Sequence, residues 1–202
     1  MGCFAVSGLF EMKVTLTCQL AFSLASLAAF PGGMVSLEGN KPDAMATVKE
    51  YTILCFGDSI TAAGYWIERL ENDSPHRFIN GGQSGRRAAH APEELGEVLD
   101  DHPEADALIL MLGVNDLPAR DPRPGEVKVA KVVADMGEAI ERARRQIDPA
   151  NILLVAPPTV YPERLSDVNL QKGYQVTPSL LAQLEAGYRA LAREKVRSWN
   201  GA

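Results

Sequence analysis

The stretch Tyr51-Thr52-Ile53-Leu54-Cys55-Phe56-Gly57-Asp58-Ser59 decides the fold of this chain. Its first six residues are rich in β-branched and aromatic side chains, which predicts a buried strand, and Gly57-Asp58 predicts a tight turn after it. Residues Ile60 to Asn72 are then expected to form a loop and a short helix. Ser59 would stand at the carboxyl edge of a sheet near a helix N-terminus, where open α/β sheets bind ligands and N–H groups stabilise anions. Taken alone, the stretch equally fits an ordinary turn with a helix cap.

Two further segments repeat this pattern of a strand followed by a glycine-rich polar turn. The strand candidate Arg77–Ile79 runs into Asn80-Gly81-Gly82-Gln83-Ser84-Gly85, and Ala107–Leu112 runs into Gly113-Val114-Asn115-Asp116. If the strands are parallel neighbours, the three turns gather at one edge of the sheet. They then present a hydroxyl, a backbone N–H beside a small residue and a side-chain amide, which are the nucleophile and oxyanion-hole donors of acyl transfer.

The rest of the chain alternates helix and strand. Helices are predicted over Ala91–Asp100, Gly125–Ile147 and from Pro178 to Lys195, and a fourth strand over Asn151–Ala156. The two longer helices carry apolar stripes that should pack on the sheet: Val133, Met136, Ile140, Ala143 and Ile147 in one, and Leu181, Leu184, Tyr188 and Leu191 in the other. The alternation predicts an α/β fold, a three-layer α/β/α sandwich with a mostly parallel, flavodoxin-like sheet.

A long loop is expected between the fourth strand and the last helix, from Thr159 to Thr177, with Tyr161, Arg164 and Tyr174 in it. Because it leaves the carboxyl end of a strand, it should overhang the edge that carries Ser59. Two interpretations stay open: a mobile surface loop, or one wall of a substrate pocket.

With its three turns in this order, the chain resembles the SGNH (GDSL) hydrolase family between Tyr51 and about Lys195. Gly57-Asp58-Ser59-Ile60 is similar to the first family block, Gly85 to the second and Gly113-Val114-Asn115-Asp116 to the third, while Pro157-Pro158 is common in its esterase branches. The resemblance implies that Ser59 is the nucleophile of an ester hydrolase. It also implies an oxyanion hole made of the Ser59 N–H, the Gly85 N–H and the Asn115 side chain. No metal or organic cofactor is implied, and the substrate would be a small acyl ester or an acetylated glycan.

The last block of that family, Asp-x-x-His, is not found in its expected place. It follows a fifth strand, and residues Ser198 to Ala202 stand where that strand should begin. We therefore expect a domain that lacks its last strand and helix, and a hydrolase impaired because a serine hydroxyl is a weak nucleophile without an adjacent base. The alternatives are a non-catalytic remnant or pseudoenzyme that binds an acyl or glycan ligand, and a small-anion binder.

Three histidines could replace the missing base. His76 ends the string Asp73-Ser74-Pro75-His76, which matches Asp-x-x-His, but it precedes the second strand and so belongs to the opposite edge. His102 precedes the third strand and has the same problem. His90 follows the Gly85 turn on the correct edge, although the favoured interpretation is a surface histidine.

Composition supports a single globular domain over residues 50–202. The 202 residues are 46% hydrophobic and 23% charged, an ordinary globular balance. The net charge of −6 argues against a nucleic-acid surface, which needs clustered Lys and Arg. The basic run Arg142-Ala143-Arg144-Arg145 is expected at a solvated helix end, where cations complement the helix dipole.

The N-terminus is not expected to be part of the fold. Residues 1–37 resemble a signal peptide starting at Met12, with Lys13, an apolar core at Leu20–Phe30 and an acceptable cleavage site at Ser26-Leu27-Ala28. Residues 38–49 would be a polar linker. This predicts a secreted or periplasmic protein; a membrane anchor is disfavoured because Pro31-Gly32-Gly33 interrupts the apolar run, and a misassigned start codon is a third option.

Cysteine usage is compatible with export. Of the three cysteines, only Cys55 would remain after loss of the leader, alone and in a buried strand, so no internal disulfide is expected. The sequence has no Cys/His cluster with the spacing of a zinc site.

Overall fold

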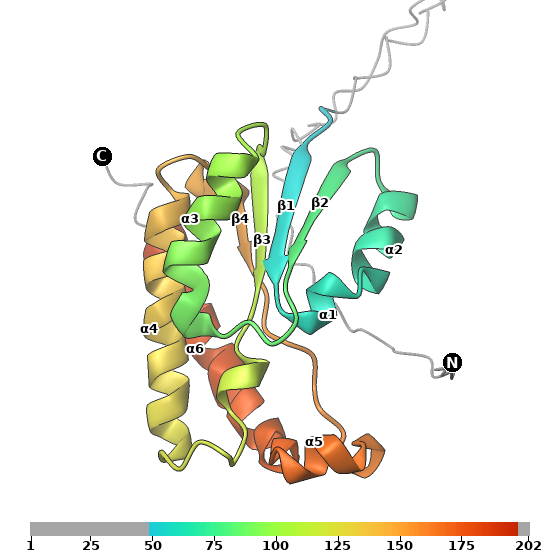
Figure 1. Ribbon diagram of the computed structural model, residues 1–202. Coiled ribbons are helices and arrows are strands. Elements are labelled where there is room, and N and C mark those ends of the chain that lie inside the picture. Colours follow the sequence, from blue (N-terminus) through green and yellow to red (C-terminus); the bar gives the residue numbers. More distant parts are fainter. Residues whose placement is uncertain (1–48, 198–202) are drawn as a thin grey trace, which may run out of the picture. The chain divides into compact units, whose positions relative to one another are not determined.

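The computed structural model describes residues 49–197. The predicted leader, the linker up to Val48 and the last five residues lie outside the described part. The described chain forms a parallel sheet of four strands in the order β2-β1-β3-β4, with helices on either side of it (Figure 1). The bounds are Thr52–Gly57 for β1, Arg77–Gly82 for β2, Ala107–Met111 for β3 and Ile152–Leu154 for β4. The predicted three-layer, flavodoxin-like α/β fold is confirmed.

Six α-helices connect and follow these strands within residues 49–197: α1 (Ser59–Ala62), α2 (Tyr65–Asp73), α3 (Ala91–Asp101), α4 (Gly125–Ala143), α5 (Asp167–Gln171) and α6 (Thr177–Arg197). Short 3₁₀ turns lie at Ala88–His90, Val114–Asp116, Pro149–Asn151, Pro162–Arg164 and Tyr174–Val176. None of the helices in this part of the chain combines the length and apolar character needed to cross a bilayer.

The strand register aligns the three turns that were predicted to carry the site. Gly57 at the end of β1 pairs with Gly82 at the end of β2 and with Met111 at the end of β3. The strand order reverses between β1 and β3, because β2 lies on one side of β1 and β3 on the other. In open α/β sheets this switch point leaves a crevice outside the carboxyl ends of the strands, where ligands bind.

The burial of β1 on both faces of the sheet explains why this strand is a continuous run of apolar residues. Leu54 and Phe56 pack into a cluster with β3, α3, α4 and α6, while Cys55 points to the opposite face and is also fully buried. A strand buried on both faces is typical of a parallel sheet. Burial also raises the pKa of the Cys55 thiol to about 12, which leaves it protonated and unreactive at neutral pH.

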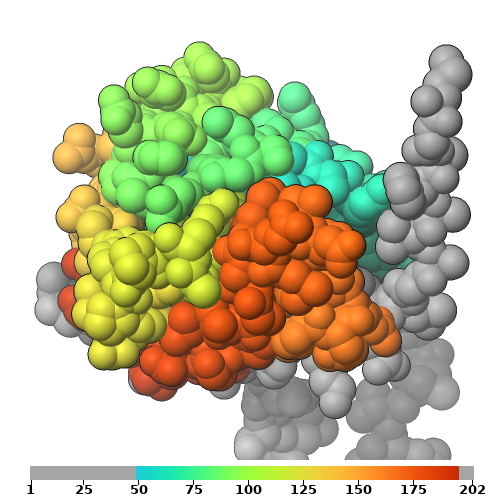
Figure 2. Space-filling model, turned by 60° about the horizontal axis from the view of Figure 1, so that its bottom comes forward, coloured from blue at the N-terminus to red at the C-terminus, as the bar shows by residue number. Residues whose placement is uncertain are grey.

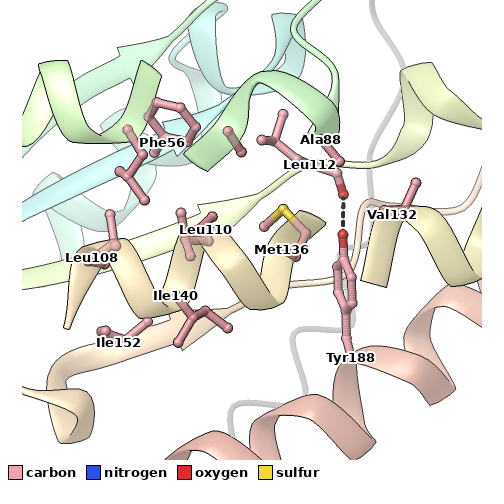
Figure 3. Close-up of a cluster of buried hydrophobic side chains, with 14 of the residues drawn as sticks. Phe56, Ala88, Leu108, Leu110, Leu112, Val132, Met136, Ile140, Ile152 and Tyr188 are labelled. Carbon is pink, nitrogen blue, oxygen red and sulfur yellow. Dashed lines mark hydrogen bonds between the residues drawn. The ribbon is translucent and has the colours of Figure 1, made fainter. Parts of the chain in front are cut away.

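Helix α6 is anchored to the sheet through its predicted apolar stripe. Leu181, Leu184, Tyr188 and Leu191 are all buried. The Tyr188 hydroxyl donates a 3.1 Å hydrogen bond to the carbonyl of Leu112, directly after β3, as Figure 3 shows beside the core residues Val132 and Met136. The helix therefore contributes both apolar area and a satisfied polar group to the core.

Several predicted boundaries were wrong. Residues Asn80–Gly82 belong to β2 and not to the turn, because they pair with the last residues of β1. The expected loop after Ser59 is instead α1, which begins at Ser59 itself. Helix α4 ends at Ala143, four residues before the predicted end, and strand β4 is confined to Ile152–Leu154.

The predicted stripe of α4 was nearly right. Met136, Ile140, Ala143 and Ile147 are buried, but Val133 is only half-buried. Its neighbour Val132, together with Val129, faces the core in its place. The 3.6-residue period thus identified the face of the helix to within one residue.

Candidate active site

Ser59 stands where β1 turns into α1. Asp58 caps this helix: its Oδ1 accepts a 2.9 Å hydrogen bond from the Ile60 N–H, and its carboxylate is almost completely buried. Gly57 has no room for a side chain, since an added Cβ would lie 2.0 Å from Thr61 Oγ1. The tight turn leaves Ser59 exposed at the carboxyl edge of the sheet as the first residue of α1. The cap interpretation and the nucleophile interpretation are therefore compatible.

The residue that precedes Ser59, Asp58, has a buried carboxyl group with a raised pKa. Burial raises the pKa of its carboxyl, and the negative charge of Asp116 acts in the same direction. Its second oxygen, Oδ2, has no hydrogen-bond partner among the described residues. A raised pKa is the expected response of a carboxyl that is buried with only one of its oxygens bonded.

Gly85 lies in the turn that follows β2. Its φ of +80° is a left-handed conformation that glycine adopts without strain, and a Cβ there would meet nothing within 4 Å. Among the described hydrogen bonds, none uses the Gly85 N–H. The turn is held to the sheet because the Gln83 N–H donates to the Gly57 carbonyl over 3.0 Å. The Gly85 N–H is thus a hydrogen-bond donor with no partner among the described bonds, on a turn that is anchored to the sheet.

Arg86 joins the ends of β1 and β2 to this turn. Its guanidinium is buried and donates to the carbonyls of Gly57 at 2.8 Å and Gly81 at 2.6 Å, and to Glu94 Oε2 at 2.7 Å. It also lies 3.9 Å from the ring centroid of Phe56, a cation–π contact. Sequence reasoning missed this role, because nothing in a glycine-rich turn distinguishes a buried arginine from the partly exposed arginine that follows it.

Asn115 completes the group from the end of β3. It is buried, its Nδ2 donates to the carbonyl of Arg86 at 3.0 Å, and its Oδ1 accepts from the Tyr174 hydroxyl at 2.6 Å. The first contact places the amide directly against the turn that carries Gly85. The structure therefore brings the predicted residues Ser59, Gly85 and Asn115 to one edge, at the point where the strand order reverses.

Asp116 contacts the residues that directly follow Gly85. Its Oδ2 accepts the Ala88 N–H at 3.0 Å and its Oδ1 lies 3.2 Å from Arg87 Nε. Burial raises the pKa of this carboxyl, whereas both of these contacts lower it. The sequence placed Asp116 in the third motif but did not show its partner. The link ties the β3 turn to the segment after Gly85.

The segment predicted as a loop from Thr159 to Thr177 contains α5 and two 3₁₀ turns. Figure 2 shows it in orange across the carboxyl edge, against the yellow segment after β3 and near the blue-green segment after β1. Two contacts fix it there: the Ala119 N–H donates to the Gly173 carbonyl at 3.1 Å, and Tyr174 bonds to Asn115. The segment therefore overhangs the site as expected, and it contacts the site directly.

All three histidines lie in the described part, and none of its hydrogen bonds joins a histidine to Ser59. His76 Nδ1 accepts from the Tyr51 N–H at 3.4 Å at the start of β1, about 20 Å along the strand from its carboxyl end. His102 caps the end of α3, at the same distal edge, with Glu104 beside it. His90 lies on the correct side but is exposed, and its Nδ1 is 3.8 Å from Glu94 Oε1. His76 and His102 therefore lie at the opposite edge from Ser59, and His90 is a surface histidine beside Glu94.

The chemistry available at this edge is that of an exposed hydroxyl on the same edge as backbone and amide hydrogen-bond donors. Within residues 49–197, no group of three or more His, Cys, Asp or Glu side chains is placed to hold a metal ion. A serine nucleophile with backbone and amide donors is the arrangement that acyl transfer requires, apart from its base.

Comparisons with known proteins place the chain among solved structures of the same fold. No curated protein sequence matched the chain. An aryl esterase from M. smegmatis superimposes with a TM-score of 0.59 at 21% identity, covering 70% of this chain and 79% of that one. A carbohydrate acetylesterase from Sinorhizobium meliloti gives a TM-score of 0.52 at 21% identity, with the same two coverages. These likenesses show a shared fold.

The family of this chain is assigned from its sequence. The family model of the GDSL-like lipase/acylhydrolases matches residues 55–199, from within β1 to beyond α6. The matched range includes all three turns whose geometry is described above. This chain therefore belongs to the GDSL-like lipase/acylhydrolase, or SGNH, family.

Proposed function

We propose that the site at the carboxyl edge is that of a serine ester hydrolase. The observation that carries the proposal is the contact between Asn115 Nδ2 and the Arg86 carbonyl, which brings the amide of the third turn against the second turn, beside the open N–H of Gly85. Ser59 Oγ would attack the ester carbonyl carbon, and the carbonyl oxygen would become the oxyanion. The Ser59 N–H, the Gly85 N–H and the Asn115 amide would stabilise that charge. The alcohol would leave, and water would release the acid from the acyl-enzyme.

We propose further that the chain of residues 1–202 is impaired in this reaction. The proton of Ser59 needs an acceptor within hydrogen-bond reach. Two of the three histidines lie at the opposite edge of the sheet, and the third, His90, lies beside Glu94. This observation favours the second candidate function, a non-catalytic protein that binds an acyl or glycan ligand at the same edge. The two candidates share the binding site and differ in whether a base reaches Ser59.

The substrate that we propose is a small acyl ester or an acetylated glycan. Two structures with the same fold are named as an aryl esterase and a carbohydrate acetylesterase, which supports small ester groups as the class. Ser59 is exposed, so its hydroxyl is accessible to such a group. The buried Asn115 at the same edge would receive only the small carbonyl oxygen.

Adding a base tests the hydrolase proposal. We expect a chain extended at its C-terminus with an Asp-x-x-His block from a family member to hydrolyse p-nitrophenyl acetate faster than the chain of residues 1–202. Replacing Ser59→Ala in the extended chain should remove the gain. Ser84→Ala is the matched control, because this exposed serine lies at the same edge next to Gly85 and should leave the gain intact. A gain that survives Ser59→Ala would assign the reaction to another group.

We also propose that the protein is exported. The apolar run Leu20–Phe30 after Lys13 supports a signal peptide, which would be removed near Ala28. Expressed with its native N-terminus in a secreting host, the extracellular or periplasmic product should begin near Ala29 by N-terminal sequencing. A cytoplasmic product that still carries residues 14–27 would contradict export.

A further inference from the structure

The Asn115 amide is the middle of a short chain of hydrogen bonds. Its Nδ2 lies 3.0 Å from the Arg86 carbonyl oxygen, and its Oδ1 lies 2.6 Å from the hydroxyl of Tyr174. A backbone carbonyl can only accept, so the nitrogen of the amide must face Arg86. The oxygen then faces Tyr174, and the phenol must be the donor. The direction of both hydrogen bonds therefore follows from the Arg86 carbonyl, which can only accept.

We propose that Tyr174 is a positioning residue for Asn115. The Tyr174 O–H holds the Asn115 amide in one orientation, in which one Nδ2 hydrogen is left for the oxyanion. The Arg86 carbonyl takes the first Nδ2 hydrogen, and the second has no other acceptor among the described hydrogen bonds. This inference rests on the proposed function, because the second hydrogen matters to catalysis only if Asn115 is an oxyanion donor.

The physical reason is preorganisation. A donor stabilises a developing charge best when it is already oriented before the charge appears. Without the phenol, the Asn115 amide would be restrained on its nitrogen side alone, by one bond to a carbonyl. Tyr174 supplies the second restraint from a segment that lies 59 residues further along the chain. The segment over the carboxyl edge thus acts on the site through one hydroxyl.

The restraint should depend on pH in the alkaline range. The charged groups that act on the Tyr174 phenol are Asp58, Asp116, Arg87 and Arg120. Burial raises its pKa above the usual value of a tyrosine; the two carboxylates act in the same direction and the two arginines against it. The phenol is therefore neutral and able to donate at pH 7. As the pH rises through this raised pKa, the donor is lost and the phenolate repels the amide oxygen.

NMR of the 202-residue chain with ¹³C,¹⁵N-labelled asparagine tests this directly. The ¹³Cγ signal of Asn115, identified by its loss in Asn115→Ala, should move with the titration of one tyrosine as the pH is raised above 10, the usual pKa of a tyrosine. In Tyr174→Phe this titration should disappear. At pH 7 the Nδ2 hydrogen that is bonded to the Arg86 carbonyl should exchange with water about tenfold faster in the variant, because the amide is then free to turn away from that carbonyl at the cost of about one ordinary hydrogen bond.

The matched control is Tyr161→Phe, which removes the half-exposed phenol of the same segment, stacked under Arg164. It should leave the titration and the exchange of Asn115 unchanged. An Asn115 signal that does not titrate in the wild-type chain, or that titrates equally in Tyr174→Phe, would overturn the proposal. These signals need no catalysis, so they remain decisive even if Ser59 never reacts with an ester.

Discussion

Ser59 should stay unlabelled when the chain of residues 1–202 is incubated with a fluorophosphonate at pH 7. The probe reacts with serines whose proton is taken by a neighbouring base. Loss of the histidine from a serine triad lowers kcat by a factor on the order of 10⁶. With His76 and His102 at the distal edge of the sheet and His90 beside Glu94, the Ser59 hydroxyl should be no more reactive than an ordinary surface serine.

Intact-protein mass spectrometry measures this result. The chain should keep its unmodified mass over hours, while the chain extended with an Asp-x-x-His block should gain one phosphonate at Ser59. The extended chain is the positive control, since it has the same nucleophile and the same donors. Rapid stoichiometric labelling of residues 1–202 that vanishes in Ser59→Ala would contradict the expected impairment. His90→Gln would then show whether His90 leaves Glu94 to act as the base.

The second large effect is expected at Asn115. Removal of one oxyanion-hole donor typically lowers kcat by a factor of about 10²–10³. In the extended chain, Asn115→Ala should lower kcat for p-nitrophenyl acetate by that much and leave KM within about threefold, because the donor acts mainly on the charge of the transition state. Steady-state kinetics with the same substrate gives both values.

Asn80→Ala is the matched control for this experiment. Asn80 also lies near the carboxyl end of a strand, where its Oδ1 accepts the Gly82 N–H at 3.0 Å and its Nδ2 donates to the Ala62 carbonyl at 3.5 Å, and neither of these bonds joins it to Gly85. Its kcat should change by less than about threefold. A loss under threefold in Asn115→Ala would exclude this amide from the hole. Thermal unfolding of both variants separates an effect on kcat from an effect on folding, since Asn115→Ala also leaves Tyr174 without its acceptor.

The sequence by itself determined the fold class and the three turns that make up the candidate site. Periodicity and turn chemistry are local signals: an apolar run ending in Gly57-Asp58 predicts a buried strand and its turn without knowledge of the rest of the chain. Parallel strands of similar length then bring their carboxyl ends to one edge. For this reason the three turns could be placed together before any contact was known, and the resemblance to the SGNH family singled out Ser59, Gly85 and Asn115 within them.

Only the tertiary structure decided how that edge is held together. Arg86 and Arg87 are neighbours in sequence, yet Arg86 is buried on the carbonyls of two strands while Arg87 is partly exposed beside Asp116. Their burial depends on strand pairing, which no local pattern encodes. The same holds for the Tyr174 hydroxyl, which reaches Asn115 from a segment that the sequence could describe only as a loop. Local signals determine where strands end, whereas contacts between residues far apart in sequence exist only once the sheet has formed.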